Sequence, residues 1–130
     1  MTRFTIANIA QPNLRQESYF FSVNNDINTD TDLRRTGSSP TNLAPCIVPF
    51  SSVTTQLILN SRSEAVNWSL ELLVNDVVAQ TFTKNNGLEV QVFTPSISLS
   101  QNDELRFRFI TGGTLTTRPS GQLRIIEVLS

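Results

Sequence analysis

The chain of 130 residues contains no histidine, one cysteine and one lysine. Without histidine it cannot build a Ser-His-Asp triad, an imidazole general base or a histidine metal site. The single cysteine, Cys46, excludes a disulfide within the chain and a cysteine zinc cluster. Ten basic residues are balanced by eleven acids to a net charge of −1, which argues against a surface that follows nucleic-acid phosphates. We therefore expect no cofactor and no nucleic-acid partner.

Long apolar runs are absent as well. No stretch reaches the roughly 20 apolar residues of a membrane-spanning helix. Residues 1–10 are too short and too polar for the core of a signal peptide. A single cysteine fits a reducing compartment. These features predict no membrane partner and synthesis in the cytoplasm.

Charged residues are scarce, at 16% of the chain against about 25% in an average protein. Ser, Thr and Asn take their place, and these side chains compete for backbone hydrogen bonds and so disfavour helices. Apolar residues instead alternate with polar ones, as in Leu105, Phe107 and Phe109, which is the period of a half-buried strand. Asn75-Asp76 separates two alternating stretches by two residues, which is typical of a hairpin.

About eight such stretches follow one another at intervals of roughly 8–12 residues. They predict an all-β fold, a jelly-roll-like antiparallel sandwich of about eight strands with an N-terminal extended arm. Residues 1–44 are irregular and polar, and we assign them to this arm and a long polar loop, or to extra strands that precede the β-domain. Residues 45–130 form the predicted jelly-roll β-domain. Trp68 is expected at the centre of its core, and the last strand in the middle of a sheet.

Several patterns could carry chemistry, and each has a plainer interpretation. The acidic stretch 26–32 resembles the start of a calcium loop, but Thr31 stands where that loop requires glycine, so a solvated loop is favoured. No two acids are marked as buried together and no Gly-x-Ser-x-Gly motif is present. We therefore expect no enzyme, no catalytic residue and no metal site. Arg106, Arg108 and Arg124 could form a stacking platform for a nucleic-acid strand, but cross-strand ion pairs with Glu104 and Glu127 explain them equally well.

The N-terminal third carries arginines and aromatics, which are enriched at interfaces. An arm that lies on a partner would use its arginines to grip carboxylates and would insert one or two aromatic rings. The plainer interpretation of the arginines is solubility. The predicted partner-binding residues are Arg3, Phe4, Arg15, Phe20, Phe21, Arg34 and Arg35.

From Val48 onward the chain follows a recognisable order of elements. The segment 67–78 gives a strand, a tight Asn turn and a return strand. The segment 97–107 gives a loop and then a strand, and Gly112-Gly113 closes a further hairpin. This order resembles the small jelly-roll modules of tailed bacteriophages, which occur as capsid decoration or cement proteins and as head-fibre or tail-fibre tips.

The resemblance implies a non-enzymatic structural protein on the capsid surface of a virion, made in the host cytoplasm. We expect a capsid decoration or cement protein that binds the major capsid protein and stabilises the shell. A tail-fibre protein would need a base and a shaft before its tip, and this chain offers no length for either. The alternative is a receptor- or carbohydrate-binding fibre-tip module.

The resemblance also implies a homotrimer, because such modules are commonly trimeric. The strand phases give a second reason, since four apolar residues fall on the phase opposite to the main core and a monomer would expose them. Cyclic closure would bury them with one repeated contact. The predicted trimer-interface residues are Leu73, Val77, Phe93 and Ile126.

Overall fold

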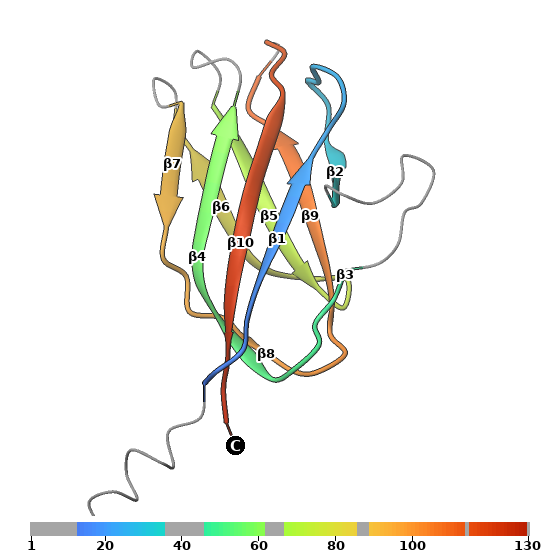
Figure 1. Ribbon diagram of the computed structural model, residues 1–130. Coiled ribbons are helices and arrows are strands. Elements are labelled where there is room, and N and C mark those ends of the chain that lie inside the picture. The colour runs from blue at the N-terminus through green and yellow to red at the C-terminus, as the bar shows by residue number, and fades with distance from the viewer. Residues whose placement is uncertain (1–12, 36–45, 62–66, 86–88, 114, 130) are drawn as a thin grey trace, which may run out of the picture.

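The computed structural model describes residues 13–35, 46–61, 67–85, 89–113 and 115–129. Within these ranges the chain forms ten strands and no helix (Figure 1), so the described part holds no helix that could cross a membrane. The strands are β1 (Gln16–Ser22), β2 (Thr31–Arg35), β3 (Cys46–Ile47), β4 (Ser52–Ser61), β5 (Trp68–Val74), β6 (Val77–Lys84), β7 (Val90–Phe93), β8 (Ser98–Leu99), β9 (Glu104–Thr111) and β10 (Pro119–Glu127).

The strands form two antiparallel layers (Figure 1). One layer has the order β1-β10-β4-β7 and the other β2-β9-β5-β6, and they join where the ends of β1 and β2 pair. The short strands β3 and β8 extend the layers beside β9 and β4. The long strands thus pair in nested order along the chain: β1 with β10, β2 with β9, β4 with β7 and β5 with β6. This is the jelly-roll order, and it confirms the predicted fold class.

Alternation along β9 separates the core from the surface. Leu105, Phe107 and Phe109 are buried between the layers, whereas Arg106 and Arg108 point outward. β1 and β10 alternate in the same way, and so does β4 apart from one bulge, whereas β6 buries only Phe82 and Lys84 near its end. Each layer therefore has an apolar inner face and an outer face. The core therefore lies between the two layers.

Aromatic rings from both layers meet at the centre of this core. Trp68 of β5 is 1% exposed, and its ring lies 5.4 Å from that of Phe109. Phe21 of β1 stacks on Phe107 of β9, with ring centroids 4.2 Å apart. The prediction that Trp68 lies in the core is confirmed, and so is the central position of the last strand, since β10 lies between β1 and β4.

The predicted hairpin between β5 and β6 is present. Asn75 and Asp76 have φ angles of 52° and 67°, the left-handed values that a two-residue type I′ turn requires. The Asn75 side chain donates to Asp103 at 2.9 Å and accepts from the backbone amide of Glu104 at 2.9 Å. The turn is thereby tied to the loop before β9 at the base of the sandwich.

The hairpin predicted at Gly112-Gly113 is wrong. These glycines follow β9, but β9 and β10 belong to opposite layers and do not pair. The connection crosses the open end of the sandwich instead. Gly112 is needed there because a Cβ at this position would collide with the backbone carbonyl of Asn67.

The part of the predicted arm that the structure describes belongs to the β-domain. β1 pairs with β10 from Gln16↔Ile126 to Ser22↔Ser120, and β2 pairs with β9. Residues 16–35 are therefore strands of the sandwich and the loop that joins them, so the alternative of extra strands is confirmed there and the arm was wrong for them. The predicted boundary at residues 44 and 45 lies outside the described residues, as do residues 1–12, for which an arm stays a prediction.

Candidate functional site

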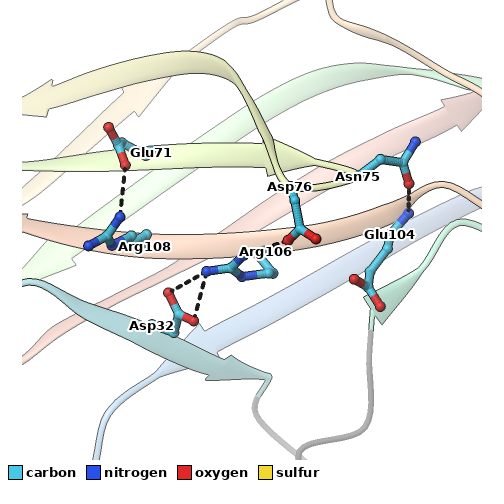
Figure 2. A network of polar contacts seen from close by, with 7 residues as sticks. All are labelled: Asp32, Glu71, Asn75, Asp76, Glu104, Arg106 and Arg108. Atoms are coloured by element: carbon cyan, nitrogen blue, oxygen red, sulfur yellow. Dashed lines mark hydrogen bonds and ion pairs between the residues drawn. The ribbon is translucent and has the colours of Figure 1, made fainter.

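The outer face of β2, β9 and β5 is held together by ion pairs, and we call it the charged face (Figure 2). Arg106 of β9 donates to Asp32 of β2 at 3.1 Å and to Asp76 of the hairpin turn at 2.5 Å. Arg108 lies 3.9 Å from Glu71 of β5. The hydrogen bond with Asp76, followed by the charge of Asp32, raises the pKa of Arg106. Arg106 and Arg108 thus form ion pairs, as expected, but the expected partners were wrong: Glu127 pairs with Arg15 instead, and Glu104 does not contribute to these pairs.

Arg124 does not join them, because it lies on β10 in the other layer. The stacking platform predicted from the three arginines is therefore not assembled.

The opposite outer face, on β1, β10, β4 and β7, has a different character, and we call it the neutral face. Strand register places Phe20, Gln122, Ile58 and Val92 side by side across its four strands.

Two further rows flank this central row. One consists of Ser18, Arg124 and Gln56, and the other of Ser22, Ser120, Asn60 and Val90. Arg124 carries the only charge in the three rows. Phe20 is 49% exposed and Val92 is 52% exposed, so the two ends of the central row present apolar surface to solvent. The neutral face is thus polar without being ionic, with an apolar stripe across it.

The structure describes five of the seven predicted partner-binding residues. Arg15 forms an ion pair with Glu127 at 2.7 Å, and its guanidinium lies 4.5 Å from the centre of the Phe50 ring. This hydrogen-bonded pairing lowers the pKa of Glu127 and raises that of Arg15. Arg15 therefore holds the first strand to the last, and it remains exposed on one side.

Phe20 and Phe21 divide between surface and core. Phe20 is exposed on the neutral face, whereas Phe21 is 1% exposed and stacked inside the sandwich. Phe21 is therefore not available to a partner, and its assignment was wrong. A Cβ on Gly121 would lie 2.6 Å from the Phe21 ring, so this glycine makes room for it.

Arg34 and Arg35 lie exposed on β2, and the Arg35 guanidinium sits 5.4 Å from the centre of the Tyr19 ring. Arg3 and Phe4 lie outside the described residues. The predicted partner residues thus do not form one surface. Only Phe20, on the neutral face, and Arg15, at the base, lie on the two surfaces discussed below.

The predicted trimer-interface residues are not brought together either. Leu73 of β5 is buried, which removes it from any outer surface. Phe93 of β7 packs against Phe82 with ring centroids 5.3 Å apart, and it closes the seam between the layers. Val77 is exposed beside the hairpin turn, while Ile126 lies on β10 in the other layer. The trimer itself stays a prediction, but these four residues do not supply one patch for it.

The acids of the stretch 26–32 point to separate partners. Asp26 pairs with Arg118 at 3.3 Å, and Asp30 accepts the backbone amide of Thr111 at 3.0 Å. Asp32 is taken up by the charged face. Among the described residues, no group of three or more possible ligands could hold a metal ion.

Sequence reasoning did not identify the burial of Lys84 or the surroundings of Cys46. Lys84 is fully buried at the end of β6. Its phase could have shown this, because it lies two residues after the buried Phe82. Cys46 lies beside the buried Tyr19, and burial raises the pKa of its thiol to about 11 and that of Tyr19 to about 12. The cysteine is therefore a protonated core residue at neutral pH.

The comparisons with known proteins found similarities of fold alone. A chain of the cyanophage Pam1 capsid asymmetric unit is similar over 98% of both chains, with 10% identity and a TM-score of 0.46. A chain from the structure of infectious bursal disease virus, Gx strain, is similar over 87% of this chain, with 13% identity and a TM-score of 0.35, and this chain covers 32% of its length. No protein-family model and no curated protein matches the sequence. Similarities this distant carry no conclusion about function.

Proposed function

We propose that the protein is a structural component of a phage particle, a decoration or cement protein that binds the major capsid protein at the capsid surface. The observation that carries this proposal is an apolar patch at the base of the sandwich. Leu14, Val128 and Leu129 are exposed there, and we call them the base patch. Exposed apolar residues that gather in one place favour contact with a partner.

The base patch lies where both ends of the described chain leave the sandwich (Figure 1). The amide of Glu127 donates to the carbonyl of Arg15 at 2.8 Å, and the amide of Val128 donates to the carbonyl of Ser51 at 2.9 Å. The described chain begins at Asn13, next to Leu14 of the patch, and the preceding residues 1–12 carry Arg3 and Phe4 in the sequence. A shell-binding surface made of the patch and this segment combines apolar burial with an arginine that can pair with carboxylates.

The acids of the charged face favour binding over catalysis. Asp32, Asp76 and Glu71 each lie within ion-pair distance of an arginine. These ion pairs join neighbouring strands across the outer face, as contacts that stabilise a sheet do. This pattern supports a structural protein better than a glycoside hydrolase.

The test is to mix the purified protein with capsid shells assembled without it and to count the copies bound per shell. Deletion of residues 1–12, or the substitutions Leu14→Asp and Val128→Asp, should lower the bound copies by about ten-fold or more. Leu115→Asp is the matched control, because Leu115 is 59% exposed in the connection that follows β9, at the opposite end of the sandwich. Equal occupancy by all four variants would sink the proposal.

A receptor- or carbohydrate-binding fibre tip is the second candidate, and one observation favours it. On the neutral face the exposed ring of Phe20 lies beside the amide of Gln122, with Ser18 and Ser22 at either end. An apolar ring among uncharged hydrogen-bonding groups suits a sugar. Binding to host-surface glycans that Phe20→Ala abolishes, together with a few copies per particle, would favour this candidate. Hundreds of copies per particle would favour the capsid.

A further inference from the structure

The neutral face presents a surface whose occupant can be argued from its own pattern. Phe20, Ile58 and Val92 form an apolar stripe perpendicular to the strands, and Gln122 of β10 interrupts it between Phe20 and Ile58. We infer that this face packs against the same face of a second copy, about a two-fold axis that runs along this row. The inference goes beyond the proposed function, because it concerns contact between copies and not contact with the shell.

Symmetry makes the row its own partner. An axis along the row places Phe20 on Phe20, Ile58 on Ile58 and Val92 on Val92 of the second copy. The strands of the two copies then run nearly antiparallel, which suits the aligned packing of two sheets about 10 Å apart. The stripe would be buried along its whole length by one repeated contact.

The same axis exchanges the two flanking rows. Arg124 of one copy therefore faces Ser120 of the other, and the two Arg124 side chains do not oppose each other. A hydroxyl can accept a hydrogen bond from the guanidinium. The only charge in the three rows thus meets an acceptor and no like charge, so association carries no repulsion.

The two amides of β4 also become complementary. Gln56 and Asn60 lie one row to either side of Ile58, so each faces the other across the axis. Their side-chain oxygens are shielded from water and have no hydrogen-bond partner among the described residues. Rotation of each amide toward the second copy gives both oxygens a donor.

The size of the face sets the expected affinity. Four strands about 4.8 Å apart offer a few hundred square ångströms per copy, which is less than the roughly 800 Å² per partner of a stable specific interface and fits a weak, reversible contact. We expect a dissociation constant in the micromolar range. Copies held close together would associate more strongly, because their effective concentration is higher. A two-fold pair is an alternative to the predicted trimer, whose assigned residues share no surface.

The first experiment is sedimentation equilibrium of the full chain from low micromolar to several hundred micromolar. We expect a reversible monomer–dimer equilibrium that Phe20→Lys and Val92→Lys each weaken by about ten-fold or more. Thr81→Lys is the matched control, because Thr81 is exposed and faces outward from β6 in the other layer. Thermal unfolding of each variant shows whether it is folded. A monomer at all concentrations, a trimer, or a dimer that tolerates both substitutions would overturn the inference.

The second experiment tests the position of the axis. Ile58→Cys places thiols on the axis in both copies, and a bis-maleimide of about 10 Å spans facing sheets. Native Cys46 is 5% exposed and should not react. Rapid cross-linking of Ile58→Cys, and little of Thr81→Cys, is the expected result. Equal yields would mean random collisions and would overturn the assigned axis. Shell binding is measured separately at the base patch, so failure here leaves the proposed function standing.

Discussion

The two outer faces of the sandwich are built by the same alternation, yet they differ in which side chains they expose to solvent. On the charged face, Arg106 and Arg108 have carboxylates within 4 Å, supplied by three neighbouring segments of the same chain. In the three described rows of the neutral face, Arg124 is the only charge, and Phe20 and Val92 remain half exposed. The charged face satisfies its own groups, whereas the neutral face leaves apolar surface that another molecule can cover.

The inner faces show no such contrast. Trp68 and Phe109, from the layer that carries the charged face, lie in one buried cluster with Phe21 and Leu123, from the layer that carries the neutral face. The layers therefore depend on each other for stability and differ in what they offer outside. Substitutions in the core should lower the stability of the whole domain. Substitutions on the outer faces should affect ion pairing on the charged face and association on the neutral face independently.

The largest effect is expected for Trp68→Ala, which empties the centre of the shared core. Loss of a buried Trp costs about 3–5 kcal/mol of unfolding free energy, a large part of the stability of a domain this size. Urea unfolding should show the loss for both layers in one transition. A midpoint close to that of the parent would contradict the central position of Trp68 and the coupling of the layers.

The next effect concerns the inner side of the neutral layer. In Gly121→Ala the new methyl group would lie 2.6 Å from the Phe21 ring and 2.5 Å from the carbonyl oxygen of Ile58. Because one of these contacts is backbone, we expect a loss of about 1–3 kcal/mol. Gly113→Ala is the control, since nothing lies within 4 Å of its Cβ. Equal stability of the two variants would show that Phe21 can move aside.

Local pattern in the sequence predicted the strands but not their neighbours. The alternation of β9 and the turn at Asn75-Asp76 are local, because each is decided by residues close in the chain. The pairing of β1 with β10 joins residues that are 98 to 110 positions apart in the chain, from Ser22 with Ser120 to Gln16 with Ile126. No local signal marks such a pairing, and residues 16–35 were therefore assigned to an arm.

The candidate surfaces depended on the same long-range register. Phe20, Gln122, Ile58 and Val92 come from four separate strands, and only the order of the layer shows that they form a row. The sequence predicted Phe20 as a contact residue, but it also selected the adjacent Phe21. Successive residues of a strand point to opposite faces, so one of two consecutive phenylalanines faces the core and the other the surface. The sequence alone did not show which of the two faces the core.

A smaller effect concerns salt, which should weaken the ion pairs of the charged face but leave association through the neutral face nearly unchanged. In a double-mutant cycle of Asp32→Ala and Arg106→Ala, we expect a coupling energy of at most about 1 kcal/mol, because both side chains are partly exposed. Added salt should reduce this coupling. Association through the neutral face should change little over the same range. A dimer that dissociates in salt together with the ion pair would contradict the difference between the two faces.

The smallest effect is expected for the ion pair at the base, and its sign follows from the pKa of Glu127. The hydrogen bonds from Arg15 lower that pKa in the folded protein, so the folded state favours the charged carboxylate. The contribution is present above the ordinary pKa of a glutamate and is lost as the pH falls through the lowered value. Glu127→Gln should therefore reduce stability near neutral pH and make no difference in acid.

Thermal unfolding of the parent and of Glu127→Gln, from about pH 6 to about pH 3, measures this difference. Gln16→Ala is a suitable control, because Gln16 is an exposed neighbour of Arg15 without a charge. The two melting curves should converge as the pH falls. Association through the neutral face, which has no carboxylate in its three rows, should not follow this titration. A gap that widens in acid would contradict the pairing of Arg15 with Glu127, and with it the way the first and last strands are joined at the base patch.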